Sequence, residues 1–500
     1  MTEAATLEAV TTTSGRVSGI TRDKHLAFLG IPYAKAKRFA APQAPDSWTG
    51  VKAADAIGLA APQTTHLIAG FSASGPQGED CLNLNVFTPA TDDKRRSVMF
   101  WIHGGGFTHG AGYEPLYNGG PLATRGDVVV VTINYRLGAL GFLRLPEIGA
   151  HGNQGLLDCI AALNWVRDNI RAFGGDPEQV TIFGESAGSA AVGCLLGMPA
   201  ARGLFRRAIM ESGAGRAATP ETADKQVDAL LKELSLDRSK VRDLLTIDPR
   251  EIVRAQTAVL QSFPSGTARG FGPVKDPGVM PDEPLRMVRN GLAKAIDIVI
   301  GSNRDENKLF VPPKREPIDD AALVAGVCAA VPTTDKSAAQ NLIETYRASR
   351  GSKKLPTDNL DILDAIGSDV RFRIPSLRLA LGQRAAGGKA FVYLFTHASP
   401  ARRGALGSCH ALELPFVFGT LNAPTQDRFA GTGVDVERLS RDVMDAWLAF
   451  ARSGDPAAKA VGAWSAYDET KRPTMVFDTR ASREENDPFG EERRALEALI

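Results

Sequence analysis

The 500-residue sequence predicts an α/β fold in which helices flank a large, mostly parallel sheet. Three observations lead to this prediction. Several short segments are almost wholly apolar, as strands covered on both faces are. Segments with helical periodicity lie between them, and this alternation is typical of α/β proteins. The chain is also long enough, and with 43% hydrophobic residues apolar enough, to bury a large core.

The predicted strands are the apolar segments 97–102, 127–133, 180–183, 296–300 and 391–395. Two of the predicted helices lie at 153–173 and 221–236, and each places aliphatic residues on one face. These residues are Leu156, Ile160, Leu163 and Ile170 in the first helix, and Val227, Leu230, Leu231 and Leu234 in the second.

The domain organisation is expected to be simple. No internal repeat, low-complexity segment or obvious linker divides the chain, so we expect one domain over residues 1–500. The regions roughly 214–290 and 310–365 are rich in helix signals. We expect them to be helical insertions over the active site.

The charge balance excludes some partners. The chain has 58 basic and 57 acidic residues and a net charge of +1, so it offers no field that attracts nucleic acid or an anionic membrane. No run of about 18 apolar residues and no secretory signal pattern is present. The five cysteines are widely spaced without a C-x-x-C pair, which favours reduced thiols and a cytoplasmic protein.

The segment GESAG, residues 184–188, follows a predicted strand and precedes an alanine-rich predicted helix. G-x-S-x-G in this context is the nucleophile elbow, in which the serine sits on a sharp, strained turn. Larger flanking side chains would collide with the neighbouring strand and helix. We therefore interpret Ser186 as a nucleophile, with a plain glycine-rich turn as the alternative. The N–H of Ala187 would lie at a helix N-terminus and stabilise negative charge.

A second glycine motif, HGGGF, follows the predicted strand 97–102. Consecutive glycines let backbone N–H groups approach a ligand closely. We expect the N–H groups of Gly105 and Gly106, together with that of Ala187, to form an oxyanion hole. A flexible loop is the alternative, but two glycine motifs at two strand ends favour a site.

A serine nucleophile needs a base. In α/β-hydrolases the order along the chain is serine, acid, histidine. His397 and His410 both follow Ser186, and the order does not choose between them. Asp305 and Glu306, which follow the strand 296–300, are both candidates for the acid.

Seven segments stand out: FLGIPYA with the following RF (28–39), EDCLNLNVFTP (79–89), FGGDPEQVTIFGESAG (173–188), GSNRDENKLF (301–310), CHALELPFVFG (409–419), WLAFARSGDP (447–456) and RPTMVF (472–477). Together they resemble the type-B carboxylesterase family, which includes cholinesterases and bacterial p-nitrobenzyl esterases. The resemblance covers most of the chain and implies the α/β-hydrolase fold. It also implies that His410 is the base and Glu306 the acid.

The sequence departs from the family pattern at several positions. The family usually has a cysteine that pairs with the one at position 81, but here its place is taken by Ala61. Cys81 therefore has no partner for a disulfide, which agrees with a reducing compartment. In the family pattern one glycine follows the catalytic glutamate and another follows the catalytic histidine. Here these positions are Asn307 and Ala411. We retain the triad because both replacements are modest in size. The loop 63–80 has no tryptophan, whereas cholinesterases carry a choline-binding tryptophan there, so we do not expect a choline-ester specialist.

Four residues are candidates for the substrate pocket: Phe107, Phe263, Phe271 and Glu185. Each has a structural alternative, which is core packing for the phenylalanines and an ion pair for Glu185. No HExxH motif or cysteine–histidine cluster is present, so we expect neither a metal site nor a cofactor.

The sequence therefore predicts a serine hydrolase that cleaves small to medium carboxylic esters through an acyl-enzyme. Its expected partner is a small-molecule ester, not a nucleic acid or a membrane. Two alternatives remain. One is an amide, carbamate or lactone hydrolase of the same fold. The other is a non-catalytic, cholinesterase-like binding protein, although such proteins typically lack the serine.

Overall fold

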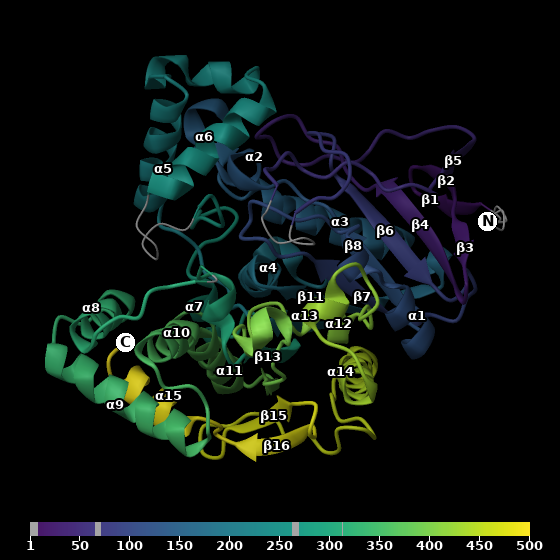
Figure 1. The fold of residues 1–500 in the computed structure, drawn as a ribbon. Coiled ribbons are helices and arrows are strands. Elements are labelled where there is room, and N and C mark those ends of the chain that lie inside the picture. Colours follow the sequence, from purple (N-terminus) through teal and green to yellow (C-terminus); the bar gives the residue numbers. More distant parts are fainter. Residues whose placement is uncertain (1–8, 66–71, 263–269, 313) are drawn as a thin grey trace.

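The computed structural model describes residues 9–65, 72–262, 270–312 and 314–500. In this part of the chain an eleven-stranded sheet carries helices on both faces (Figure 1). Its strands, in spatial order, are β16 (Arg483–Asn486), β15 (Pro473–Phe477), β14 (Ala390–Phe395), β13 (Asp297–Asn303), β12 (Arg207–Glu211), β11 (Gly175–Glu185), β7 (Arg96–Ile102), β8 (Val129–Ile133), β6 (Asn83–Thr88), β4 (His25–Pro32) and β3 (Ile20–Arg22). The strands from β15 to β8 run parallel, and the outer strands are antiparallel. The predicted α/β fold is confirmed.

Smaller elements complete the fold. Two minor sheets consist of β1 (Val10–Thr12), β2 (Gly15–Ser18) and β5 (Val51–Ala53), and of β9 (Arg144–Leu145) and β10 (Ala150–His151). The α-helices are α1 (Gly120–Gly126), α2 (Gly138–Phe142), α3 (Gln154–Asn169), α4 (Ala187–Gly197), α5 (Pro220–Glu233), α6 (Pro249–Ser262), α7 (Pro284–Arg289), α8 (Asp320–Ala330), α9 (Lys336–Ser352), α10 (Asn359–Ser368), α11 (Ile374–Ala385), α12 (Leu414–Val417), α13 (Gln426–Phe429), α14 (Val434–Ser453) and α15 (Gly490–Glu497). The two predicted helices correspond to α3 and α5.

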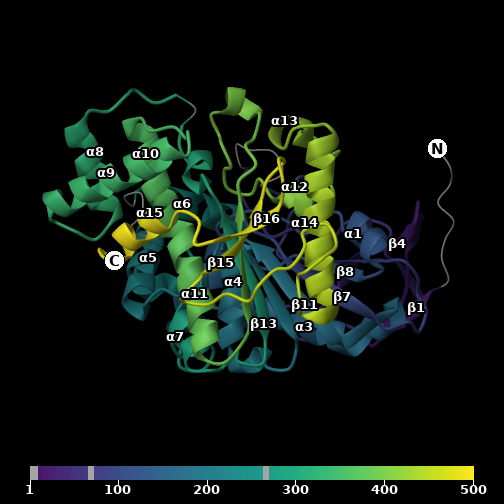
Figure 2. The same cartoon turned by 90° about the horizontal axis from the view of Figure 1, so that it is seen from below.

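The five predicted strands lie in β7, β8, β11, β13 and β14, and their side chains enter two hydrophobic cores. In β7, Phe100 and Ile102 join one core while Met99 and Trp101 join the other, because successive side chains of a strand point to opposite faces. Helices α3, α4 and α11 cover the first core, and α1, α12 and α14 the second. Figure 2 shows α11 and α14 beside the strands. Burial on both faces explains the continuous apolar runs.

The helix-rich regions lie beside the sheet. Region 214–290 contains α5, α6 and α7, and region 310–365 contains α8, α9 and most of α10. In Figure 1, α5 and α6 lie together on one side of the molecule, and α8, α9 and α10 lie on another. Their assignment as insertions in one domain stays a prediction. Among the described helices, none is long and apolar enough to cross a bilayer.

The carboxyl ends of the parallel strands bring the sequence motifs to one edge of the sheet. In the strand register, Gly184 of β11 pairs with Ile102 of β7, and Glu185 pairs with Glu211 of β12. The HGGGF loop and the serine turn therefore leave neighbouring strands side by side. The acid loop leaves β13 at the same edge, on the far side of β12. This is the edge at which open α/β sheets bind their ligands.

A buried ion pair holds the loop after β8 to α3. Arg136 and Asp158 form a two-pronged contact, with Nε to Oδ2 at 2.8 Å and Nη2 to Oδ1 at 2.6 Å. Their side chains are 6% and 0% exposed. Removing one partner leaves the other as a buried, uncompensated charge, which is far costlier than losing a surface pair.

We expect Asp158→Asn to lower the free energy of unfolding by about 3–5 kcal/mol, because Arg136 loses its counter-charge. Asp168→Asn, on the same helix, is the matched control. Its pair with Arg167 is about half exposed, so the loss should be below about 1 kcal/mol. Urea unfolding of both variants measures the difference. Equal losses would show that burial of the Arg136 pair is not what makes it important.

Candidate active site

Ser186 lies in the turn between β11 and α4. Its backbone dihedral angles are φ 56° and ψ −117°, in the positive-φ region that non-glycine residues rarely adopt. Its N–H donates to the Glu211 carbonyl oxygen, and its own carbonyl oxygen accepts the N–H of Ala190, both at 2.8 Å. The strained turn is therefore anchored on β12 and on α4.

The glycines on either side of Ser186 allow α4 to start very close to β7. A Cβ atom on Gly184 would lie 2.8 Å from the carbonyl oxygen of Ile102. One on Gly188 would lie 2.0 Å from the same oxygen. Both separations are shorter than side chains tolerate, so only glycine fits at either position. This supports the sequence-based reason for small residues beside the serine.

The HGGGF loop lies directly against the serine turn. A Cβ atom on Gly104 would come within 2.8 Å of the Glu185 carbonyl oxygen and within 3.3 Å of the Ser186 Cβ. His103 is buried, and its Nδ1 lies 2.9 Å from the Gly104 carbonyl oxygen. The loop is therefore held close to the serine by packing and by its first residue.

Three backbone N–H groups near the serine have no acceptor in the described structure. They belong to Gly105, Gly106 and Ala187. Gly105 and Gly106 have φ angles of 105° and 64°, which a residue with a side chain adopts only with strain. Ala187 is the first residue of α4, where N–H groups carry partial positive charge. These three groups are therefore available as hydrogen-bond donors.

His410 lies between two carboxylates. Its Nδ1 is 2.6 Å from Oε2 of Glu306 in a hydrogen bond, and its Nε2 is 2.9 Å from Oε1 of Glu185. The second contact is a close approach of charges without hydrogen-bond alignment, because Oε1 of Glu185 has no hydrogen-bond partner among the described residues. Oε1 of Glu306 accepts the N–H of Asn303 at 2.7 Å. Glu306 is thus fixed while it holds the imidazole.

The other histidine candidate is engaged elsewhere. Nε2 of His397 lies 2.8 Å from the carbonyl oxygen of Ala430, and its Nδ1 is 3.4 Å from Oγ1 of Thr479. His397, just after β14, therefore contacts the segments that follow α13 and β15 rather than the acid. The geometry favours His410, in agreement with the family resemblance.

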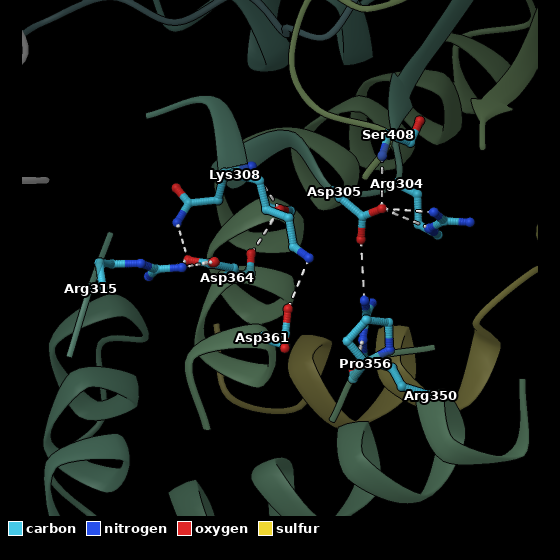
Figure 3. A network of polar contacts seen from close by, with 11 residues as sticks. Arg304, Asp305, Lys308, Arg315, Arg350, Pro356, Asp361, Asp364 and Ser408 are labelled. Carbon is cyan, nitrogen blue, oxygen red and sulfur yellow. Dashed lines mark hydrogen bonds and ion pairs between the residues drawn. The ribbon is translucent and has the colours of Figure 1, made fainter. Parts of the chain in front are cut away.

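Asp305, the other acid candidate, binds arginines (Figure 3). Its carboxylate accepts from Nε of Arg304 at 2.9 Å, from the N–H of Ser408 at 3.0 Å and from Nη2 of Arg350 at 3.2 Å. Burial raises the pKa of Asp305, but Arg304 and Arg350 lower it more, to about 2. Asp305 thereby ties the Glu306 loop to the loop that leads into His410.

The predicted pocket residues have mixed environments. Phe107 is half-buried and packs edge-on against Phe142, with ring centres 5.0 Å apart. Phe271 is 2% exposed and belongs to the first core. Phe263 lies outside the described residues. Glu185 is buried and reaches His410.

Two aromatic residues beside His410 were missed by the sequence analysis. The rings of Phe310 and Phe372 have their centres 4.9 Å and 4.8 Å from the imidazole centre. Phe310 is 47% exposed, so it offers apolar surface next to the histidine. Its place four residues after Glu306 could have suggested it. Phe372 gave no signal, because only the fold brings its helix to His410.

Two further carboxyl groups lie behind the serine turn. Glu211 accepts from Nε1 of Trp447 at 2.7 Å. Glu413 accepts from Oγ of Ser212 at 3.1 Å and from Nδ2 of Asn303. With Glu185 and Glu306 they form a cluster of four buried glutamates. Within the described chain, no lysine or arginine forms an ion pair with any of the four.

A family model described as the carboxylesterase family matches residues 6–494. The chain belongs to the carboxylesterase family. It is 39% identical over 506 residues to the para-nitrobenzyl esterase of Bacillus subtilis (strain 168), across 98% of this chain and 99% of that protein. It is 33% identical to the phenmedipham hydrolase of Pseudarthrobacter oxydans, across 91% and 92%. A solved PNB esterase structure superposes with a TM-score of 0.87 at 38% identity, covering 98% of this chain and 99% of the other.

Membership in this family confirms two predictions from the sequence. The protein is a serine carboxylesterase, a hydrolase of carboxylic esters, and it has the α/β-hydrolase fold. The type-B resemblance seen in separate motifs thus extends over nearly the whole chain.

The carboxylesterase surrounds His410 with negative charge. Burial lowers the pKa of His410, but Glu185 and Glu306 together raise it more, so the net shift is upward. Burial raises the pKa of Glu185, and His410 opposes that shift. Burial, Glu185 and Glu306 raise the pKa of Glu413 to about 8. The cluster therefore holds protons on some of its carboxyl groups near neutral pH, and it favours the imidazolium form of His410.

We expect Glu185→Gln to shift the acid limb of kcat/KM to lower pH by about one pH unit or more. The base form of His410 is lost as pH falls through its pKa, and the variant removes a carboxylate that raises that pKa. Profiles of kcat/KM from pH 4 to 10 measure the shift. Glu178→Gln, at an exposed position of the same strand, should leave the profile unchanged. An acid limb at the same or a higher pH in the Glu185 variant would contradict this electrostatic role.

Proposed function

We propose that Ser186, His410 and Glu306 are the catalytic triad of this carboxylesterase. The observation that carries the proposal is the 2.6 Å hydrogen bond from the His410 ring to a fully buried Glu306. Such a bond fixes the tautomer that leaves Nε2 to accept a proton, and it stabilises the imidazolium that then forms. The strained, anchored turn supports Ser186 as the nucleophile.

In the proposed mechanism, Ser186 Oγ attacks the ester carbonyl carbon while Nε2 of His410 takes the hydroxyl proton. The tetrahedral intermediate collapses, the C–O bond to the alcohol breaks, and His410 returns the proton to the departing alcohol. Water then attacks the acyl-enzyme, with His410 taking a proton from it. The bond between the acyl carbon and Ser186 Oγ breaks, His410 returns the proton to Oγ, and the carboxylic acid leaves. Glu306 stays ionised throughout and orients the ring.

The proposed oxyanion hole consists of the N–H groups of Gly105, Gly106 and Ala187. All three lack another acceptor among the described residues, and the packing of Gly104 on Ser186 supports their position near the reacting carbonyl. In comparable enzymes one such donor contributes about 3–4 kcal/mol to transition-state stabilisation.

The proposed substrates are small to medium carboxylic esters with apolar groups. Phe310 and Phe372, which flank His410, support an apolar pocket beside the triad. We also propose Phe107, Phe263, Phe271 and Glu185 as pocket residues, as the sequence predicts. The name of the para-nitrobenzyl esterase relative suggests p-nitrobenzyl esters as a first substrate class.

A reducing, cytoplasmic setting is part of the proposal. All five cysteines are free, and four of them are buried. Burial raises the pKa of the thiols of Cys81, Cys159, Cys194 and Cys409, which keeps them protonated and unreactive.

We expect Ser186→Ala to lower kcat on p-nitrophenyl acetate and butyrate by at least about 10⁴-fold, because the acyl-enzyme cannot form. An organophosphate should add to the wild-type enzyme once, at Ser186, as read by peptide mass spectrometry. The variant should take up no adduct. An adduct elsewhere, or full turnover by the variant, would remove Ser186 from the mechanism.

A further inference from the structure

Asn307 follows the proposed catalytic acid, at a position where the family pattern has glycine. Its backbone N–H donates to Oγ of Ser368 at 2.9 Å, and its Nδ2 donates to Oδ1 of Asp364 at 3.1 Å. Both partners belong to α10. A glycine could make only the first bond, so the replacement adds a side-chain tie between the acid loop and α10.

Neighbouring ion pairs hold the same loop to α10. Nζ of Lys308 lies 2.8 Å from Oδ1 of Asp361, and Asp364 also binds Nη2 of Arg315 at 2.5 Å (Figure 3). The Asn307 side chain is therefore fixed on a rigid support.

Arg371 connects Asn307 to the aromatic residues beside His410. Its Nη1 donates to Oδ1 of Asn307 at 2.9 Å. Its guanidinium carbon lies 4.6 Å from the ring centre of Phe310 and 5.2 Å from that of Phe372. These distances are within the range of cation–π attraction. One end of the guanidinium is thus tied to the acid loop while the group covers Phe310.

Phe310 needs such support to keep its place. Its side chain is 47% exposed, so its open side contributes no packing that fixes the ring. The covered side contacts Phe372, with ring centres 6.0 Å apart and planes 6° apart, and also His410 and Arg371. Loss of Arg371 would remove one of these few contacts.

We propose that Arg371, tied by Asn307, is a positioning residue that holds Phe310 as a fixed wall of the substrate pocket and so sets the acyl-chain preference of the esterase. The inference rests on the proposed function, because it places the pocket beside His410. A fixed ring restricts the space next to the reacting carbonyl and favours short acyl groups. A released ring can move aside for longer ones.

Arg371→Leu tests this inference with p-nitrophenyl acetate, butyrate and octanoate. We expect kcat/KM for octanoate relative to acetate to rise roughly 2–5-fold, the size of one exposed cation–π contact. The change should be mainly in KM, with kcat on acetate retained, because the triad is untouched. Organophosphate titration counts the active sites, so misfolded protein does not enter the ratio.

Two further variants separate the contact from general damage. Asn307→Gly removes the hydrogen bond between Arg371 and Asn307 and should change the ratio in the same direction. Arg347→Leu is the matched control, because Arg347 also donates to an asparagine, Oδ1 of Asn359 at 2.7 Å. No ring contact of Arg347 occurs in the described structure, so this control should leave the ratio unchanged.

A double-mutant cycle with Phe310→Ala decides whether Arg371 acts through the ring. In the Phe310→Ala background, Arg371→Leu should no longer change the chain-length ratio. An unchanged ratio in the single variant, or an equal change in both backgrounds, would overturn the inference. These outcomes leave the proposed triad intact. Wild-type enzyme that neither turns over nor takes up the organophosphate would instead overturn the proposed function.

Discussion

The close packing of α4 against the carboxyl end of β7 is the constraint on which the site depends. Gly188 sits so near the Ile102 carbonyl oxygen that any side chain would overlap it. With α4 starting this close, the chain must reverse within one residue, and Ser186 takes the strained conformation. The same approach brings Gly104 against the Ser186 Cβ. One packing contact therefore brings together the nucleophile, a helix N-terminus and the glycine loop.

Behind this contact the fold buries four glutamates, of which Glu185 and Glu306 contact His410. Buried carboxylates without cationic partners are costly, and proteins reduce the cost by keeping some of them protonated. The raised pKa values of Glu211 and Glu413 have this origin. His410 gains from the arrangement, because it becomes a cation once it has taken the serine proton. The surroundings thus stabilise the charge that the proposed mechanism creates.

The parts of the site that depend on local sequence could be predicted, and those that depend on packing could not. The serine turn and the HGGGF loop follow from glycine spacing at strand ends. The order of residues along the chain could not separate His410 from His397. The family resemblance implied His410, and the through-space contacts with Glu306 and Ala430 agree with it. Phe372 is 38 residues before His410 in the numbering, and its helix meets the imidazole only in the folded chain. The sheet was predictable because burial on both faces makes its strands continuously apolar.

At the two positions where the family pattern has glycine, the size of the new residue does not by itself show how the structure accommodates it. The Asn307 side chain forms hydrogen bonds with α10 and with Arg371, and so joins both to the acid loop. Ala411 has a φ angle of 62°, so its cost is backbone strain of about 1–2 kcal/mol. Its methyl group is fully buried in the second core, which returns about 0.8 kcal/mol. The replacement next to His410 therefore remains unfavourable by up to about 1 kcal/mol, while the one next to Glu306 adds new contacts.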